Sequence, residues 1–193
     1  MPIIAVGVTG HRHLTEIDKI MTGVERVIQR LVATFPGTNF RVLSSLAEGA
    51  DRILANRLLD IPNATLWAPL PLPQDEYLND FEDSKSKNEF THLLAKAERK
   101  IELPFKNIRD EAYLAAGMYI IDNCDVLLAI WDGRPARDKA GTGQIVALAR
   151  KRSLPLAWIY AGNNESMPGL RVSGEIRQGT ITFENFPPPG REV

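Results

Sequence analysis

The segment Ile3–Phe35 decides the fold, and it reads IIAVGVTGHRHLTEIDKIMTGVERVIQRLVATF. Residues Ile3–Val8 are apolar or glycine at every position, which indicates a strand buried on both faces. From Ile17 onward the apolar side chains recur every three or four residues, which predicts a long amphipathic helix that ends before Pro36-Gly37. A buried strand, a glycine-containing loop and an amphipathic helix together form the first half of a βαβ unit.

The same alternation of apolar strands and amphipathic helices continues along the chain. Further strands are predicted at Phe40–Leu43, Ala64–Ala68, Lys100–Leu103, Val126–Trp131 and Leu156–Tyr160. Further helices are predicted around Ala50–Leu58, Phe90–Ala97, Asn107–Asn123 and Ile145–Ala149. Strands that are apolar on every residue are covered on both faces, so the pattern predicts an α/β fold. We expect a Rossmann-like doubly wound, mainly parallel sheet with helices on both faces and the first strand at its centre.

The predicted domain covers residues 1–161, and residues 162–193 form a carboxyl-terminal extension. This extension contains a candidate edge strand at Thr180–Phe183 and a proline-rich, linker-like tail at Pro187–Gly190.

Composition limits the classes of function. The chain has 193 residues, of which 44% are hydrophobic and 24% charged, as is ordinary for a globular protein. Its formal net charge is −1, so we expect neither nucleic acid nor a membrane surface as a partner. No apolar stretch is long enough to span a bilayer, and the amino end does not resemble a signal peptide. The single cysteine, Cys124, cannot form an internal disulfide, so we expect a cytoplasmic protein.

Ligands of parallel sheets bind at the carboxyl ends of the strands, and the first loop there contains Thr9, Gly10, His11 and Arg12. Glycine lets the backbone approach a ligand, and an arginine can bond a phosphate through two N–H groups. The alternative is a plain turn with a solvent-exposed arginine.

The loop after the second strand, Ser44–Arg52, offers a second group of polar side chains. The hydroxyls of Ser44 and Ser45 precede a helix start and favour an anion. Glu48 and Asp51 are suited to accepting hydrogen bonds from ribose hydroxyls. The alternative is that the serines cap the helix and the two acids stabilise its first turn.

The loop after the most apolar strand contains Asp132 and Arg134, followed by Gly141-Thr142-Gly143-Gln144 at a helix start. Backbone amides at a helix amino end carry partial positive charge and suit a phosphate. The alternative is a flexible glycine loop in which Thr142 caps the helix.

The predicted ligand-binding residues are therefore Thr9, Gly10, His11, Arg12, Ser44, Ser45, Glu48, Asp51, Asp132, Arg134, Gly141, Thr142, Gly143 and Gln144. We predict no metal site and no resident cofactor. The acidic segment Gln74–Asp83 carries two aromatic residues and is either a lid or a solvated surface loop, of which we favour the solvated loop.

Two common nucleotide-binding motifs do not match the chain. Gly7 and Gly10 do not have the Gly-x-Gly-x-x-Gly spacing, and no Walker lysine pattern follows the first strand.

Taken in order, several segments resemble the SLOG superfamily, which unites the DNA-processing SMF proteins and the LONELY GUY proteins. The resemblance rests on Val6–Arg12, Leu43–Arg52, Asp75–Phe81, Asn123–Gly133 and Gly141-Thr142. It implies a nucleotide-derived ligand, such as a derivative of NAD or ADP-ribose, that is held by these loops. Many members are thought to be sensors in bacterial conflict systems, which implies an effector domain or protein as partner. LONELY GUY members are phosphoribohydrolases.

The chain departs from the LONELY GUY pattern where catalysis depends on it. Ile145 stands at the position of the catalytic glutamate with Gln144 beside it, and Ala112–Met118 has no arginine in the matching turn. We therefore predict a ligand sensor without catalytic residues. The alternative is a nucleotide N-glycosidic hydrolase in which Glu48 or Asp132 supplies the carboxylate. The alanine-rich helix around Ala112–Met118 further suggests a homo-oligomer.

Neither Ile145 nor Gln144 can stabilise a developing positive charge on a ribosyl carbon as a carboxylate can. We therefore expect the purified protein to release no adenine from AMP, as measured by chromatography against a sample without protein. Release well above that sample, abolished by Glu48→Gln, would contradict this prediction.

Overall fold

In the computed structural model, residues 1–104, 109–135, 141–162 and 177–190 are described. The strands are β1 (Ile3–Gly10), β2 (Asn39–Leu43), β3 (Thr65–Leu70), β4 (Arg99–Glu102), β5 (Val126–Trp131), β6 (Leu156–Tyr160) and β7 (Ile181–Glu184). The helices are α1 (Ile17–Thr34), α2 (Ala50–Leu59), α3 (Gln74–Tyr77), the 3-10 helix η1 (Leu78–Asp80), α4 (Ser84–Ala95), α5 (Arg109–Asn123) and α6 (Thr142–Lys151). The predicted helix start at Asn107 lies outside the described residues.

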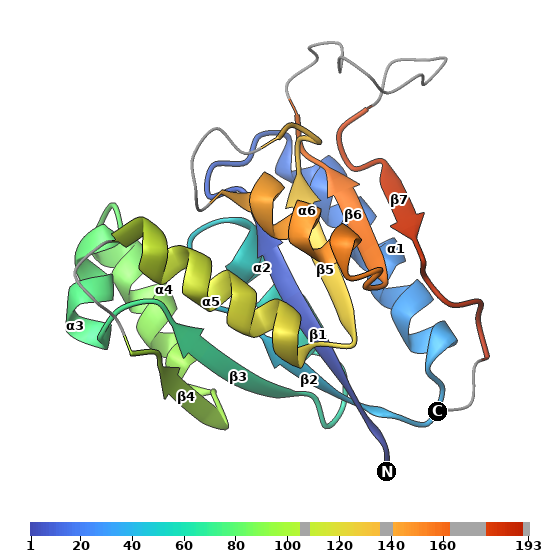
Figure 1. The fold of residues 1–193 in the computed structure, drawn as a ribbon, viewed down its shortest axis with the longest axis horizontal. Coiled ribbons are helices and arrows are strands. Elements are labelled where there is room, and N and C mark those ends of the chain that lie inside the picture. Colours follow the sequence, from blue (N-terminus) through green and yellow to red (C-terminus); the bar gives the residue numbers. More distant parts are fainter. Residues whose placement is uncertain (105–108, 136–140, 163–176, 191–193) are drawn as a thin grey trace.

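One sheet organises the molecule, with the strand order β4-β3-β2-β1-β5-β6-β7 (Figure 1). Neighbouring strands from β4 to β6 are parallel, and β7 pairs antiparallel with β6. The order reverses beside β1, which pairs with β2 on one side and with β5 on the other. The prediction of a doubly wound, mainly parallel sheet with the first strand in its centre is confirmed.

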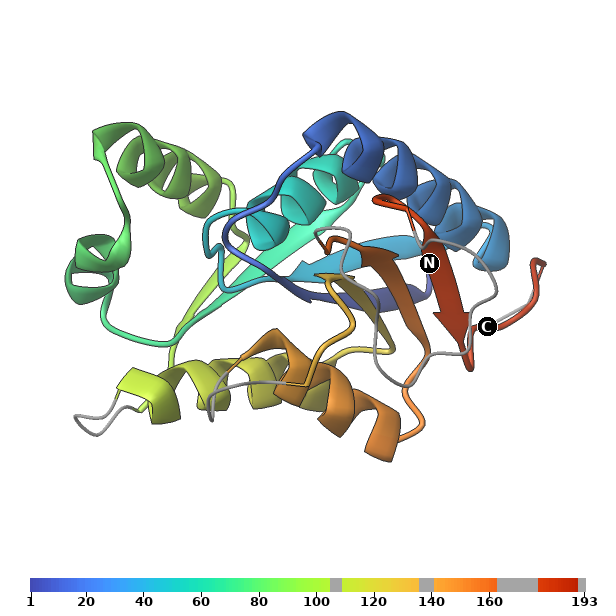
Figure 2. The same ribbon diagram turned by 90° about the horizontal axis from the view of Figure 1, so that it is seen from above.

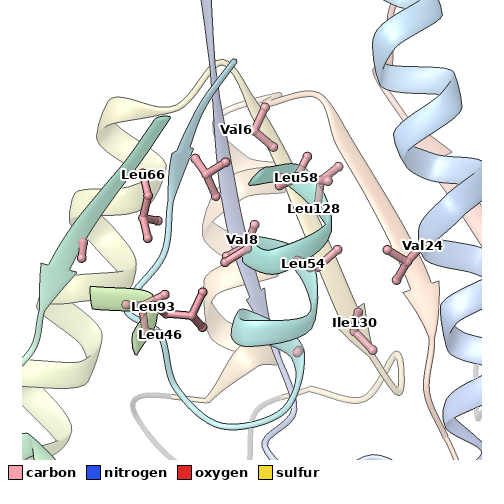
Figure 3. Packing of buried hydrophobic residues seen from close by; sticks show 14 of the residues in the cluster. Val6, Val8, Val24, Leu46, Leu54, Leu58, Leu66, Leu93, Leu128 and Ile130 are labelled. Carbon is pink, nitrogen blue, oxygen red and sulfur yellow. The ribbon is translucent and has the colours of Figure 1, made fainter. Parts of the chain in front are cut away.

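Helices cover both faces of the sheet, with α1 and α2 on one side and α5 and α6 on the other (Figure 2). Val6, Val8 and Leu128 point from the sheet toward Leu54 and Leu58 of α2 (Figure 3). These side chains are fully buried. Burying a leucine or valine side chain contributes roughly 1.5–3 kcal/mol to the free energy of folding. The apolar faces that the sequence predicts therefore supply much of the stability.

The bounds of two strands, β3 and β7, differ from those that the sequence predicts. β3 continues through Pro69 to Leu70, beyond its predicted end at Ala68. Pro69 is paired with Ile101 of β4, but the bonds to that side involve Leu66 and Leu70, so the backbone nitrogen of Pro69 faces β2. The last β2–β3 pair is Leu43 with Trp67, so the missing N–H lies beyond that ladder. The candidate edge strand is present as β7. The proline-rich tail contacts α1, because the Gly190 N–H donates to the Ala33 carbonyl at 2.9 Å.

Part of the alanine-rich helix α5 packs within the chain, whereas Ala115 and Met118 are exposed, so the expected homo-oligomer stays a prediction. Ala112 and Ala116 are each only 2% exposed. A Cβ atom at Gly117 would lie 2.3 Å from Cδ1 of Ile145, so the two helices α5 and α6 approach closely at this point.

Among the described residues, no helix is long and apolar enough to cross a membrane.

The first edge strand, β4, is short and charged. Arg99, Lys100 and Glu102 are exposed, and the Lys100 ammonium pairs with the Glu102 carboxylate at 2.9 Å.

Gly10 gives a test of the junction between β1, α2 and β5. A Cβ atom at this position would lie 2.4 Å from both Ala50 Cβ and the Ile130 carbonyl oxygen. Because a backbone atom cannot move aside cheaply, Gly10→Ala should lower the free energy of unfolding by about 2 kcal/mol or more in urea titrations.

The matched control is Gly37→Ala. Gly37 has a φ of +70° and no atom within 4 Å of an added Cβ, so only the backbone conformation carries a cost, of about 1 kcal/mol. Equal losses in the two variants would contradict the close packing at Gly10.

Candidate functional site

A cavity of about 800 Å³ lies at the carboxyl ends of the central strands, where the strand order reverses. The loops after β1, β2, β5 and β6 line it, together with the inner side of α5. Small-molecule sites in proteins have volumes of roughly 300–1,000 Å³ and favour this position in doubly wound folds.

Eleven of the fourteen residues predicted to bind the ligand line this cavity. They are Thr9, Gly10, His11, Arg12, Ser45, Asp51, Asp132, Arg134, Gly141, Thr142 and Gly143. Ser44, Glu48 and Gln144 are not among its lining residues. Three separate loops therefore meet where the parallel sheet was expected to bring them together, while their role in binding stays a prediction.

Glu48 instead joins its loop to the start of α4. Its carboxylate accepts a hydrogen bond from the Glu82 N–H at 3.1 Å and a second one from the Ser86 hydroxyl. Arg52 strengthens the same connection, because its guanidinium donates to the Ser86 carbonyl at 3.0 Å and lies over the Phe81 ring. The Glu48 side chain thus has a structural position, away from the cavity wall.

The two helix starts are not capped by the predicted hydroxyls. Gly49 is the N-cap of α2, and the Ser44 hydroxyl accepts from the Leu46 N–H at 3.0 Å inside the preceding loop. Gly141 is the N-cap of α6, and Thr142 is the first helical residue. The capping alternatives for Ser44 and Thr142 are therefore wrong.

His11 and Asp132 connect the loop after β1 to the loop after β5. The Asp132 N–H donates to His11 Nε2 at 3.1 Å, and Oδ1 of Asp132 lies 3.1 Å from the same nitrogen. Oδ1 also accepts from the Arg134 N–H at 3.0 Å. One ring nitrogen cannot accept the amide proton and donate to the carboxylate together, so only one of these two contacts is a hydrogen bond at a time.

Arg12 lines the cavity beside Tyr113 of α5. Its guanidinium carbon is 5.2 Å from the centre of the Tyr113 ring. The Tyr113 hydroxyl donates to Asp80, which also pairs with Arg109. This chain of contacts ties the segment after β3 to the start of α5.

Asp51 is the most perturbed carboxyl group of the cavity. It is 6% exposed, and burial raises its pKa to about 7. The Ala47 N–H, the Arg12 and Arg52 guanidiniums and the Ser44 hydroxyl favour the ionised form, but they offset only part of the cost of burial.

The segment after β3 supplies one cavity residue, Tyr77, that we did not predict. Our preference for a solvated loop at Gln74–Asp83 is wrong, because Tyr77 is fully buried and Phe81 is 4% exposed. The Tyr77 ring centre lies 4.9 Å from that of Phe81 and 5.5 Å from that of Phe90. The four-residue spacing of Tyr77 and Phe81 was an available signal, but the many acidic neighbours masked it. Tyr113 and Trp131 also line the cavity and were not predicted as site residues.

The fold and the cavity define a Rossmann-like α/β protein with a ligand cavity at the switch point of its sheet. No protein-family model and no curated protein matches this chain. Among solved structures, the chain is similar to DNA processing protein A from Helicobacter pylori, described for its single-stranded DNA binding mode. The two are 19% identical, with a TM-score of 0.55 over 84% of this chain and 68% of that one. The comparison establishes a shared Rossmann-type fold, as the resemblance to the SLOG superfamily implied.

This comparison also corrects an expectation. The net charge of −1 led us to expect no nucleic acid as a partner. The neighbour with this fold binds single-stranded DNA, which contradicts that expectation.

The raised pKa of Asp51 can be tested through stability. In the folded chain this carboxyl ionises at about pH 7, against an ordinary value of 3.8. Between these values the folded state holds a proton that the unfolded state has released, so stability falls as pH rises. Asp51→Asn removes this titration. Between pH 5 and pH 8 the free energy of unfolding of the wild type, measured by urea titration, should therefore fall by about 3 kcal/mol more than that of the variant.

Asp75→Asn is the control, because Asp75 is exposed on α3. The free energy of unfolding of this variant should change between the two pH values as that of the wild type does. A stability difference between wild type and Asp51→Asn that is the same at both pH values would contradict the assignment.

Proposed function

We propose that this protein binds a phosphorylated nucleotide in the cavity and acts as a ligand-sensing module. The observation that carries the proposal is the convergence of the loops after β1, β2 and β5 on one cavity at the strand-order reversal. The volume of about 800 Å³ exceeds what a phosphate alone requires, and it suits a nucleotide or a larger derivative such as ADP-ribose.

The start of α6 is the proposed phosphate end. Gly141 and Gly143 leave the backbone open to close approach, and the first amides of a helix have no acceptor inside the helix. Arg134, whose Nε lies 4.0 Å from Oδ2 of Asp132, also lines the cavity and can add a charge-assisted bond. Arg12 lies with Asp51 and Tyr113 instead, so we assign it to the part of the ligand away from the phosphate.

A sensing role is favoured over hydrolysis by the residue that follows this turn. Ile145 is 4% exposed and packs against Gly117, so no carboxylate occupies the position of the glutamate in the LONELY GUY pattern. Of the two acids considered as substitutes, Glu48 is bonded to the start of α4. Asp132 lines the cavity beside His11, which makes it the carboxylate to test if hydrolysis is found.

A second candidate ligand is a nucleotide within single-stranded DNA. It is favoured by the similar fold of DNA processing protein A, which binds single-stranded DNA. An unlabelled oligothymidylate that displaces bound AMP would support this candidate, and failure to displace AMP would favour the free nucleotide.

Calorimetry with AMP and ADP-ribose tests the proposal. Arg134→Ala should weaken binding about ten- to hundredfold, because a charge-assisted contact to the phosphate is lost. Gly141→Val should weaken it as well, by blocking the approach of the phosphate to the backbone.

Arg26→Ala is the matched control, because Arg26 is exposed on α1. It should bind both nucleotides as the wild type does. The proposal is contradicted if neither nucleotide binds, or if the control loses as much affinity as Arg134→Ala.

A further inference from the structure

Packing explains the ring of Tyr77 but not its hydroxyl group. The ring is held by Phe81 and Phe90, and its centre lies 6.1 Å from that of Tyr113. A phenylalanine would make the same contacts. The hydroxyl is buried and has no hydrogen-bond partner among the residues that the structure describes. A buried hydroxyl without a partner costs free energy, so such a group calls for an explanation.

The surroundings of this hydroxyl are polar and belong to the cavity. Tyr77, Asp51, Arg12 and Tyr113 all line it. Burial and the nearby Asp51 carboxylate raise the pKa of the Tyr77 hydroxyl well above its ordinary value. The hydroxyl therefore stays protonated and can both donate and accept.

We infer that Tyr77 and Asp51 form a second recognition point of the cavity, which binds an uncharged hydrogen-bond donor of the nucleotide at a distance from its phosphate. This inference rests on the proposed function. Above about pH 7, where Asp51 is ionised, its carboxylate only accepts hydrogen bonds and Tyr77 supplies a further acceptor, so the complementary ligand group carries O–H or N–H donors. Two parts of a nucleotide have this chemistry: a ribose hydroxyl and the exocyclic amine of the base.

Because three aromatic rings hold the side chain, the Tyr77 hydroxyl is fixed before the ligand arrives. A group in a fixed position loses little freedom on binding, and it rejects ligands that leave it unpaired. Tyr77 is therefore a specificity-determining residue.

Tyr77→Phe tests this role with the smallest change. It should lower the affinity for AMP about tenfold, as expected for one lost hydrogen bond. The melting temperature without ligand should stay the same or rise, because the variant removes a buried polar group that had no partner in the free protein. Tyr119→Phe, the same change on α5 outside the cavity lining, should leave the affinity unchanged.

Two further probes identify the donor. If 2′-deoxyadenosine monophosphate binds weakly and is insensitive to Tyr77→Phe, the donor is the ribose 2′-hydroxyl. If inosine monophosphate behaves in this way, the donor is the exocyclic amine. Equal affinity of wild type and Tyr77→Phe for AMP would overturn this inference alone. Failure of the wild type to bind any of the probes would overturn the proposed function.

Discussion

The pairing of β1 with β2 on one side and β5 on the other is the constraint on which the site depends. In this register Gly10 pairs with Ile130, and the next residue continues the pairing, because the His11 N–H donates to the Ile130 carbonyl at 3.0 Å. The His11 carbonyl then accepts from the Ala50 N–H, also at 3.0 Å. Backbone bonds thus attach the first loop both to the next strand and to the start of α2, before any side chain takes part.

Most of the sheet was predictable because its strands are apolar throughout and separated by helices of regular period. Val126–Trp131 illustrates this, since all six residues are buried as the sequence indicated. The errors concern features that depend on distant partners. Pro69 remains in a strand because β2 has already ended beside it, and no local pattern reveals where a neighbouring strand stops.

The candidate site, like the sheet, was predictable in part. The topology of a parallel sheet correctly predicted that loops distant in sequence would meet, which brought Asp51 and Gly141 to one cavity. The topology did not predict which polar side chains would bond to other parts of the protein and not line the cavity. Glu48 bonds to Ser86, 38 residues away, and only the tertiary structure provides that partner. Net charge was also a poor guide, because one value for the whole surface does not describe a cavity in which Arg12 and Asp51 lie near each other.

The charged strand β4 has a consequence for solubility. The outer side of an edge strand presents unpaired backbone N–H and C=O groups, which can recruit a strand from another molecule. In β4 the exposed side chains of Arg99, Lys100 and Glu102 would have to lose water for such pairing to occur. The strand is also only four residues long, which leaves few ladder bonds to compensate. This edge of the sheet therefore disfavours aggregation.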